Sequence, residues 1–343
     1  MAFTNSSPHS WLNSAIAQLA GVNVTVFGDF CLDAYWQLEP GQAELSVETG
    51  LPVRRVLAQR YGLGGAGNVA ANLIDLGVRR VRTVGVIGPD LFGHEMLRLL
   101  HAVGAEASPG MVTDDRCQTM VYTKPCRGDE EESRIDFGAF NTLQESTIDE
   151  LMAALDQAAA ESDAVVLNQQ VPGGVSSAGV IERINQVIAR HPRTYFVVDA
   201  RHRAELYRHA TLKVNAQEAT RLLGEATEDE LSMEQVRELA RRVSRLSSKP
   251  AFITCGDRGI VVADGDAVEE APGIQVLGKT DPVGAGDTVV SAIAAVLGSG
   301  QGPIVAARLA NIAATVTVRK LQQTGTAKPA EILAIGPDPD YIY

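Results

Sequence analysis

The stretch from Asp281 to Asp287 places two glycines, Gly284 and Gly286, on either side of Ala285. Without bulky side chains, the backbone N–H groups of this segment can approach a bound group closely. The ten residues after it are small and apolar and predict a buried helix. A glycine-rich turn that opens a helix directs N–H groups and the positive end of the helix dipole at one point, which favours an anion.

The carboxylate of Asp287 needs its own explanation at such a site, because its charge competes with the anion. We expect Asp287 to take the proton from a hydroxyl that then attacks a phosphate, as a general base. The N–H groups of Gly284, Ala285 and Gly286 then hold the charge that develops during the transfer. The alternative is that Asp287 only caps the N-terminus of a tightly packed helix.

Two further carboxylates follow the first buried strand. The β-branched run from Val22 to Phe27 predicts that strand, and Asp29 and Asp33 come directly after it. Open α/β sheets bind ligands at the carboxyl ends of their strands, so both carboxylates are candidate substrate ligands. The alternative for each is a solvated turn, which is weaker for Asp33 because its neighbours are apolar.

The segment from Gly62 to Gly67 contains a G-x-G-x-x-G pattern, which on paper is a dinucleotide fingerprint. The residues before it make a poor buried strand, so the pattern is weak evidence for NAD binding. We expect instead a close approach of backbone to a polar ligand, with Asn68 offering both a donor and an acceptor. Tight packing of small residues is the structural alternative.

Strands and helices alternate along most of the chain, which predicts a parallel sheet covered by helices on both faces. Two segments, 34–61 and 117–137, depart from this alternation and predict small β excursions, the second a hairpin that turns near residue 128. The expected strands are 22–27, 81–87, 164–167, 194–198, 211–215, 251–254 and 260–263. The expected helices are 92–103, 147–160, 176–190, 233–246, 303–320 and one after residue 67.

The composition describes an ordinary globular chain of 343 residues with a formal charge of −12 and no basic run, which argues against a nucleic-acid partner. The N-terminus has neither a basic start nor a long apolar core, so no signal peptide, transmembrane span or membrane partner is expected. Residues 1–21 read as a loose tail and a short amphipathic helix. The four cysteines form no CxxC pair and fit reduced thiols in the cytoplasm.

Four motifs in this order resemble those of the ribokinase-like, or PfkB-type, carbohydrate kinases over about residues 22–330. Gly64–Asn68 is similar to the amino-terminal signature, and Asn215-Ala-Gln-Glu218 to the N-x-x-E motif. Thr254–Gly259 is similar to the T-x-G-x-x-G nucleotide loop, and Asp281–Asp287 to the carboxyl-terminal D-T-x-G-A-G-D. Pro282 stands where that last signature has Thr.

Within that family the chain is most similar to the heptose-7-phosphate kinase half of the bifunctional lipopolysaccharide-heptose enzymes. The matching segments are Gly28–Trp36, Ser46–Val53 with Glu48, and Arg134-Ile-Asp136. The segment 168–173 departs from their S-D-Y-x-K-G pattern, and Asp199-Ala-Arg201 stands where they carry D-P-K. A related but different sugar or sugar phosphate is therefore also expected as a candidate acceptor.

The resemblance implies a three-layer α/β sandwich at 22–335, with a mostly parallel sheet and a small β lid formed by 34–61 and 117–137. It implies in-line transfer from ATP to a sugar or sugar phosphate, magnesium near Glu218 through water, and a homodimer formed through the lid. It leaves open whether a monovalent cation is also a cofactor. The implied sugar ligands are Asp29, Asp33, Glu48, Gly64, Gly65, Asn68, Arg134 and Asp136, and the implied nucleotide ligands are Asn215, Thr254, Gly256, Gly259, Asp281 and Asn311.

Two rival functions remain open from the sequence. A protein of this fold could sense a nucleotide or sugar without turnover, although Asp287 and Glu218 are both present. An NAD-dependent oxidoreductase could use Gly62–Gly67. Assays of NADH binding and of ATP-dependent ADP release separate these possibilities.

Overall fold

The computed structural model describes residues 10–41, 44–128, 130–171, 174–175, 177–226, 230–321 and 324–336. Its main sheet has nine strands in the order β14-β13-β12-β11-β10-β9-β1-β4-β5. These strands are β1 Asn23–Gly28, β4 Arg80–Ile87, β5 Met111–Thr113, β9 Ala164–Gln169, β10 Tyr195–Ala200, β11 Thr211–Asn215, β12 Ala251–Thr254, β13 Gly259–Asp264 and β14 Ala267–Pro272.

The strands of the main sheet are parallel from β5 to β12. The pairs β12–β13 and β13–β14 are antiparallel. The carboxyl ends of β1, β9, β10, β11 and β12 therefore meet along one edge of the sheet. That edge is where ligands of open α/β sheets bind.

Helices cover both faces of the main sheet and bury two separate cores. On β9, Ala164 and Val166 belong to one core, while Val165 and Leu167 belong to the other, as the two-residue period of a strand requires. The first core lies under α1 Ser10–Leu19, α2 Ala66–Asp75, α3 Leu91–Val103, α8 Ala285–Gly298, α9 Pro303–Val318 and α10 Pro329–Ile335. The second lies under α4 Glu145–Ala160, α5 Ala178–Arg190, α6 Ala216–Leu222 and α7 Met233–Ser247. The expected three-layer α/β sandwich is confirmed.

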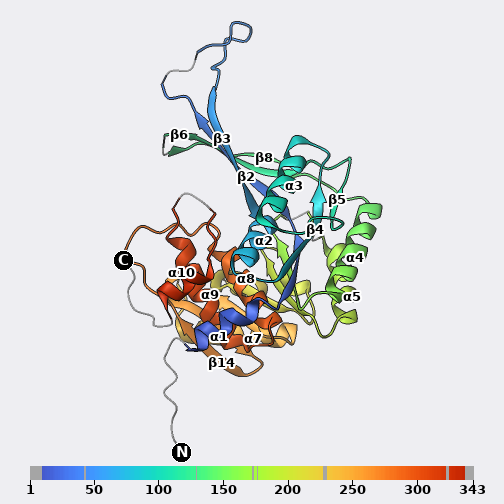
Figure 1. The fold of residues 1–343 in the computed structure, drawn as a ribbon, viewed down its shortest axis with the longest axis vertical. Helices are drawn as coiled ribbons and strands as arrows, with labels where there is room; N and C mark the ends of the chain where they lie inside the picture. The colour runs from blue at the N-terminus through green and yellow to red at the C-terminus, as the bar shows by residue number, and fades with distance from the viewer. Residues whose placement is uncertain are drawn as a thin grey trace, which may run out of the picture.

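A second sheet of five strands, here called the lid, stands apart from the main sheet. It has the order β3-β2-β6-β7, and β8 also pairs with β6. Its strands are β2 Phe30–Leu38, β3 Val56–Gly65, β6 Met120–Arg127, β7 Glu130–Glu131 and β8 Ile135–Phe137. Figure 1 shows β2 and β3 rising from the body, with their connecting loop at the far end. Both expected β excursions thus share one sheet.

The lid begins and ends closer to the core than the expected bounds of 34–61. Only Asp29 separates β1 from β2, and β3 runs to Gly65, where α2 starts. Asp33, Gly62 and Gly64 therefore belong to lid strands rather than to loops. The turn signals that suggested loops there are overridden by the β pairing of Phe30–Leu38 with Val56–Gly65.

Among the described residues, no helix is long and apolar enough to cross a membrane. The expected N-terminal helix corresponds to α1, whereas the expected tail at 1–9 lies outside the described residues.

Candidate active site

The glycine-rich loop and the first turn of α8 carry the expected base. Gly284 is the N-cap of α8, with φ 81°, a left-handed conformation that glycine adopts without a steric penalty. Asp287 is the third helical residue rather than the cap, so the capping alternative does not describe its position. The side chain of Asp287 is partly buried and faces Asn68, whose Nδ2 donates a hydrogen bond to Oδ2 across 2.7 Å.

A buried chain of polar side chains orients Asn68. Asn72 Nδ2 donates to the backbone oxygen of Asn68 at 2.9 Å and to its Oδ1 at 3.3 Å. Asn72 Oδ1 in turn accepts from Thr288 Oγ1 at 2.7 Å, and Thr288 lies next to Asp287. The amide oxygen of Asn68 is thus occupied, which leaves its nitrogen to face the carboxylate of Asp287.

Burial raises the pKa of Asp287 from 3.8 to about 7. The hydrogen bond from Asn68 and the positive charges of Lys213 and Arg201 lower it, and the charge of Asp199 raises it further. A carboxyl group with a pKa near neutrality exchanges protons at the pH of a cell, which suits general base catalysis.

Lys213 lies in the middle of the buried strand β11 and brings a positive charge close to the glycine-rich loop. Its Nζ lies 3.1 Å from Asp199 Oδ1. Burial alone lowers the pKa of Lys213, but the charges of Asp199 and Glu218 outweigh it and raise the pKa. A methyl group added at Gly286 would lie 3.1 Å from this Nζ, so Lys213 borders the glycine-rich loop. An anion held by that loop would therefore meet a lysine as well as N–H groups.

The lid places Asp33 at the edge of the site. Asp33 is buried on β2, and Lys124 Nζ on the neighbouring strand β6 lies 3.5 Å from its Oδ1. Lys124 also donates to the Tyr35 hydroxyl at 3.2 Å. Asp33 pairs in register with Gly62 on one side and with Tyr122 on the other. The Asp33 carboxylate, predicted from the sequence as a substrate ligand, is therefore also half of an ion pair.

The glycines of Gly62–Gly67 have packing reasons of their own. A methyl group on Gly64 would lie 3.0 Å from Asp33 Oδ2, and one on Gly65 would lie 2.6 Å from the backbone oxygen of Asp29. The strand before them, β3, lies in the antiparallel part of the lid instead of in the main sheet. A dinucleotide fingerprint needs a buried parallel strand at that point, so the NAD alternative lacks its structural context.

The position of Asp29 argues against both the substrate contact and the solvated turn that its sequence suggested. Asp29 is 1% exposed, and its carboxylate accepts hydrogen bonds from the backbone N–H groups of Gln170, Val171 and Val175. Burial nevertheless raises its pKa, because three hydrogen bonds offset only part of the lost hydration. Asp29 therefore ties the start of the lid to the segment after β9, of which Pro172 and Gly173 lie outside the described residues.

Three other expected sugar ligands lie on the exposed part of the lid. Arg134 pairs with Asp136 at 2.7 Å, and its guanidinium lies 4.6 Å from the centre of the Tyr122 ring. Asp136 pairs in register with Tyr122, so it shares a face with Asp33. Glu48 is exposed in the loop between β2 and β3, beyond the last paired residues Leu38 and Val56.

A cavity of about 460 Å³ opens beside the glycine-rich loop, and we call it the nucleotide cavity. It brings together four of the expected nucleotide ligands and two residues of the glycine-rich loop, from three separate segments of the chain. These are Thr254, Gly256 and Gly259 near β12, Ala285 and Gly286 on α8, and Asn311 on α9. Apolar side chains, among them Ile260, Ile274 and Val289, complete a wall suited to a flat base.

Asp281 departs from the nucleotide assignment. Its Oδ1 accepts from the Val283 N–H at 3.0 Å, and both residues line a different cavity, of about 410 Å³, beneath the lid with Lys124. Its neighbours Thr280 and Pro282 line the nucleotide cavity instead. The backbone turn at 281–283 therefore separates the two cavities.

Asn215 and Glu218 form a capping box at the start of α6. Each side chain accepts a hydrogen bond from the other residue's backbone N–H at 2.8 Å. The box orients Glu218 toward the cavity that it lines, with Lys213 close enough to feel its charge. Among the described residues, no three His, Cys, Asp or Glu side chains gather as a metal site. A single carboxylate fits magnesium that arrives with ATP and keeps most of its water.

Four residues of this site were missed from the sequence. Lys213 and Lys124 both lie inside strands, and a lysine inside a buried strand is a signal because lysine is rarely buried unless it is paired. Asn72 lies one helical turn after Asn68, a spacing that puts both on one face. Asp199 follows three apolar residues of β10, and nothing in its spacing points to Lys213.

The sequence matches a known protein family and several curated proteins. The model of the pfkB family carbohydrate kinases matches residues 24–331. A D-beta-D-heptose 7-phosphate kinase of Bordetella bronchiseptica is 31% identical over 89% of this chain and 93% of its own length. The bifunctional protein HldE of Hydrogenovibrio crunogenus is 27% identical over 89% of this chain, which spans 61% of that longer protein.

A solved structure shares the fold. Phosphofructokinase-2 from Escherichia coli, in complex with potassium, superimposes with a TM-score of 0.71 and 18% identity, covering 92% of this chain and 98% of that one.

Proposed function

Because the chain belongs to the pfkB family of carbohydrate kinases, we propose that it transfers the γ-phosphoryl group of ATP to a hydroxyl of a sugar or sugar phosphate. Asp287 takes the proton of that hydroxyl, whose oxygen forms the new bond to phosphorus as the bond to the ADP oxygen breaks. The observation that carries the proposal is the position of the Asp287 carboxyl in the first turn of α8, beside the glycine-rich loop and in contact with Asn68 Nδ2.

The donor side is formed by the glycine-rich loop and the nucleotide cavity. ATP binds with its base in that cavity, between Gly256 and Asn311. Its terminal phosphates lie at the N–H groups of Gly284–Gly286, where Lys213 supplies charge as negative charge develops. Glu218 holds the hydration shell of the Mg2+ that accompanies ATP. Pro282 removes a hydroxyl and an N–H near this loop, so a monovalent cation such as potassium remains an optional cofactor.

The acceptor lies between Asp287 and the lid. Asn68 and Asp33 bind its hydroxyls, and the lid excludes water that would otherwise hydrolyse ATP. A heptose phosphate is the favoured acceptor, because a relative of nearly the same length is named as a heptose 7-phosphate kinase.

We also propose a homodimer formed through the lid. The loop and strand at the lid's outer end expose large apolar side chains: Val47 is 100% exposed, Leu51 66%, Leu57 61% and Leu45 59%. Such a patch on a protruding sheet favours coverage by a second copy. The four cysteines are free thiols, which supports a reducing compartment such as the cytoplasm.

The test is ADP release with ATP, Mg2+ and a panel of sugars and sugar phosphates that includes heptose 7-phosphate. Release that depends on one acceptor, and is lost in Asp287→Asn, supports the kinase. If the protein binds ATP but no sugar in the panel causes ADP release, the result supports a sensor. If it binds NADH and not ATP, the result supports the oxidoreductase.

A further inference from the structure

Asn168 lies at the carboxyl end of β9, at the edge of the main sheet where ligands of open α/β sheets bind. It is 1% exposed, and in the part of the chain that the structure describes its Nδ2 is one of three buried side-chain atoms without a hydrogen-bond partner. An unpaired buried donor destabilises the fold, so native proteins keep few of them, and each one needs an explanation such as a role in binding or catalysis.

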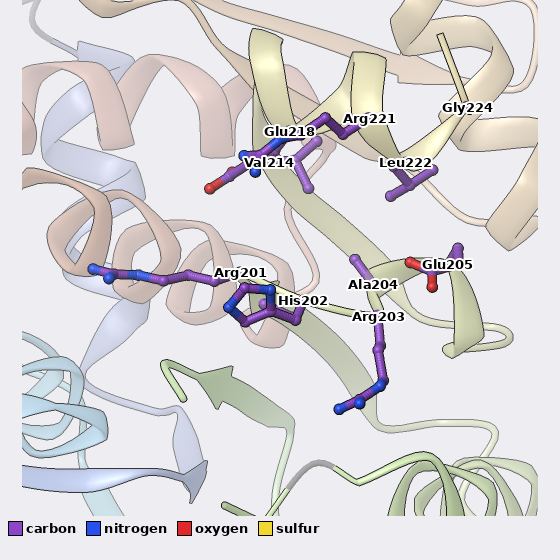
Figure 2. A pocket seen from close by; sticks show the side chains of 11 residues that line it. Arg201, His202, Arg203, Ala204, Glu205, Val214, Glu218, Arg221, Leu222 and Gly224 are labelled. Carbon is purple, nitrogen blue, oxygen red and sulfur yellow. The ribbon is translucent and has the colours of Figure 1, made fainter. Parts of the chain in front are cut away.

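The neighbouring amide, Gln169, has a structural task that Asn168 lacks. Gln169 lies on the opposite face of the sheet, as the two-residue period of a strand requires. Its Oε1 accepts from the backbone N–H of His202 at 3.0 Å, and its Nε2 donates to the Val171 oxygen at 3.2 Å. Gln169 thus holds the turn after β10, whose residues Arg201 and His202 border the cavity of about 520 Å³ in Figure 2.

Asn168 lies on the face of the sheet that is covered by the helix of the base. On β9 it follows Val166 by two residues, and Val166 belongs to the core beneath α8, so both side chains share that face. A methyl group added at Gly298, the last residue of α8, would lie 3.2 Å from Ala164 Cβ at the start of β9. Since α8 packs along β9 and β10, its first turn, with Asp287, lies toward the carboxyl end of β9.

The lengths of the two elements bring Asn168 and Asp287 to similar heights above that contact. Asp287 precedes Gly298 by 11 residues, about 16 Å along a helix. Asn168 follows Ala164 by four residues, about 13 Å along a strand. The register partner of Asn168 on β10 is Asp199, whose charge acts on Asp287. Asn168 therefore belongs to the polar group beneath the base.

A second amide connects Asn168 with the acceptor side of the site. Gln170 Nε2 donates to Asn168 Oδ1 at 3.2 Å. A methyl group on Gly65 would lie 3.3 Å from Gln170 Cγ, and one on the preceding Gly64 would lie 3.0 Å from Asp33 Oδ2. The Asn168 amide thus lies between the base and the carboxylate proposed to bind sugar hydroxyls. Gln170 is only half-buried, so its side chain can turn aside for a ligand.

We propose that Asn168 Nδ2 donates a hydrogen bond to a hydroxyl oxygen of the acceptor, one that is not phosphorylated, and so selects acceptors that carry this hydroxyl. The proposal rests on the proposed function and deepens it by adding a specificity residue to the acceptor site. The bound hydroxyl supplies the partner that the buried nitrogen lacks. An acceptor without that hydroxyl leaves the nitrogen unpaired, and sites of this kind discriminate strongly against such analogues.

The first test measures stability and needs no ligand. Leu has nearly the shape of Asn, so Asn168→Leu removes the unpaired donor without opening a cavity and should leave the Tm unchanged or raise it by about 1–3 °C. The matched control is Asn185→Leu, because the buried Asn185 donates to Leu206 O at 2.8 Å and accepts from the Arg208 N–H at 2.9 Å. The control should lower the Tm. A fall in Asn168→Leu as large as that in the control would make Asn168 a structural residue and overturn the proposal.

The second test measures selection between acceptors. The acceptor that the panel identifies is compared, by kcat/KM, with its single deoxy analogues in the unaltered protein and in each variant. One deoxy analogue should be at least tenfold poorer than the complete sugar for the unaltered protein. Asn168→Leu, and the smaller substitution Asn168→Ser, should reduce that ratio to within about twofold, the effect of removing the group that reads the hydroxyl, while Asn185→Leu preserves it. A ratio that the Asn168 variants retain overturns the proposal.

A binding measurement decides the case in which no acceptor is turned over and the proposed kinase fails. The sugars of the panel are titrated by calorimetry onto the protein saturated with Mg2+ and a non-hydrolysable ATP analogue. A sugar that binds the unaltered protein at least tenfold more tightly than it binds Asn168→Leu supports the hydrogen bond from Asn168, since that is the usual effect of losing a bond to a buried group. Equal affinity for both proteins, or no bound sugar, overturns it.

Discussion

The Nδ2 atom of Asn68 lies 2.7 Å from Oδ2 of Asp287 and joins α2 to α8, between residues 219 positions apart in the chain. A donor in this place stabilises the charged carboxylate and so lowers the pKa of Asp287, which burial has raised to about 7. Together with burial and the charges of Asp199, Lys213 and Arg201, this bond determines the pH at which the base becomes active.

Asn68→Ala should therefore move the acid side of the pH–rate profile to higher pH. The carboxylate loses its donor, its pKa rises, and a smaller fraction is ionised at neutrality. The measurement is kcat/KM from pH 5.5 to 9. Asn311→Ala, an amide in the nucleotide cavity, serves as the control and should raise the KM for ATP without moving that profile. An unmoved profile in Asn68→Ala would remove Asn68 from control of the base.

Asp287→Asn should reduce turnover by roughly 10²- to 10⁴-fold, the usual loss for a general base. Asn has nearly the same shape, but it cannot accept the proton at neutral pH. ATP affinity should persist or rise slightly, because a negative charge near the phosphates is removed. The control is Asp264→Asn on the exposed end of β13, which should leave turnover unchanged. Turnover of Asp287→Asn within about threefold of the parent is incompatible with Asp287 as a general base, because that loss is far below the usual effect.

The pH dependence of the free energy of unfolding should also reflect the raised pKa of Asp287. The pKa of this carboxyl is about 7 in the folded chain and near 3.8 when unfolded, so the folded state holds its proton more tightly. Its contribution to the free energy of unfolding is fully present below about pH 4 and is lost as the pH rises through 7. Denaturant unfolding of the parent and of Asp287→Asn at pH 5, 6, 7 and 8 should show the variant gaining relative stability as the pH rises. A constant difference would mean that the pKa is not raised.

Asp33→Ala should impair use of the sugar far more than binding of ATP. Sugar hydroxyls lose their acceptor and Lys124 loses its ion-pair partner, which together cost on the order of 2–4 kcal/mol in kcat/KM for the acceptor. Direct titration of ATP into the variant should give the parental affinity. An unchanged kcat/KM for the acceptor would make Asp33 a purely structural residue.

Val47→Asp should disrupt the proposed dimer, because a charge would enter an apolar contact between two lids. Sedimentation velocity should show the parent at twice the monomer mass and the variant as a monomer. Leu91→Asp is the control, since Leu91 is 85% exposed at the start of α3 and not in the apolar loop between β2 and β3. A parent that already sediments as a monomer, or equal behaviour of both variants, contradicts assembly through the lid.

Much of this fold follows from the local pattern of its sequence. The buried strands β1, β9, β10, β11 and β12 are runs of apolar residues ended by polar ones, and such runs fix both the strand and the place where it stops. The short edge strand β5 was not expected, because three half-exposed residues carry too little pattern. The helix α10, of seven residues, was not expected either, because it is too short to show a period.

The site divides in the same way. Gly284–Asp287 could be identified because a glycine-rich helix start has one geometry. The role of Asp29 could not, because its three N–H partners come from a segment more than 140 residues away. Asn215 and Glu218 show the converse: their spacing is that of a capping box, which the sequence contained and which a reading of the motif as a phosphate site alone overlooked.

The connection of the lid to the body has a mechanical consequence. One end of the lid joins β1 through Asp29, and the other passes from Gly65 directly into α2, the helix that carries Asn68. Neither connection contains a loop, so we expect the lid to move as a rigid body about Asp29 and Gly65. A movement of the outer end of the lid over a substrate should therefore shift the first turn of α2, which carries Asn68. Closure of the lid should thus change the hydrogen bond from Asn68 to Asp287, and with it the pKa of the base.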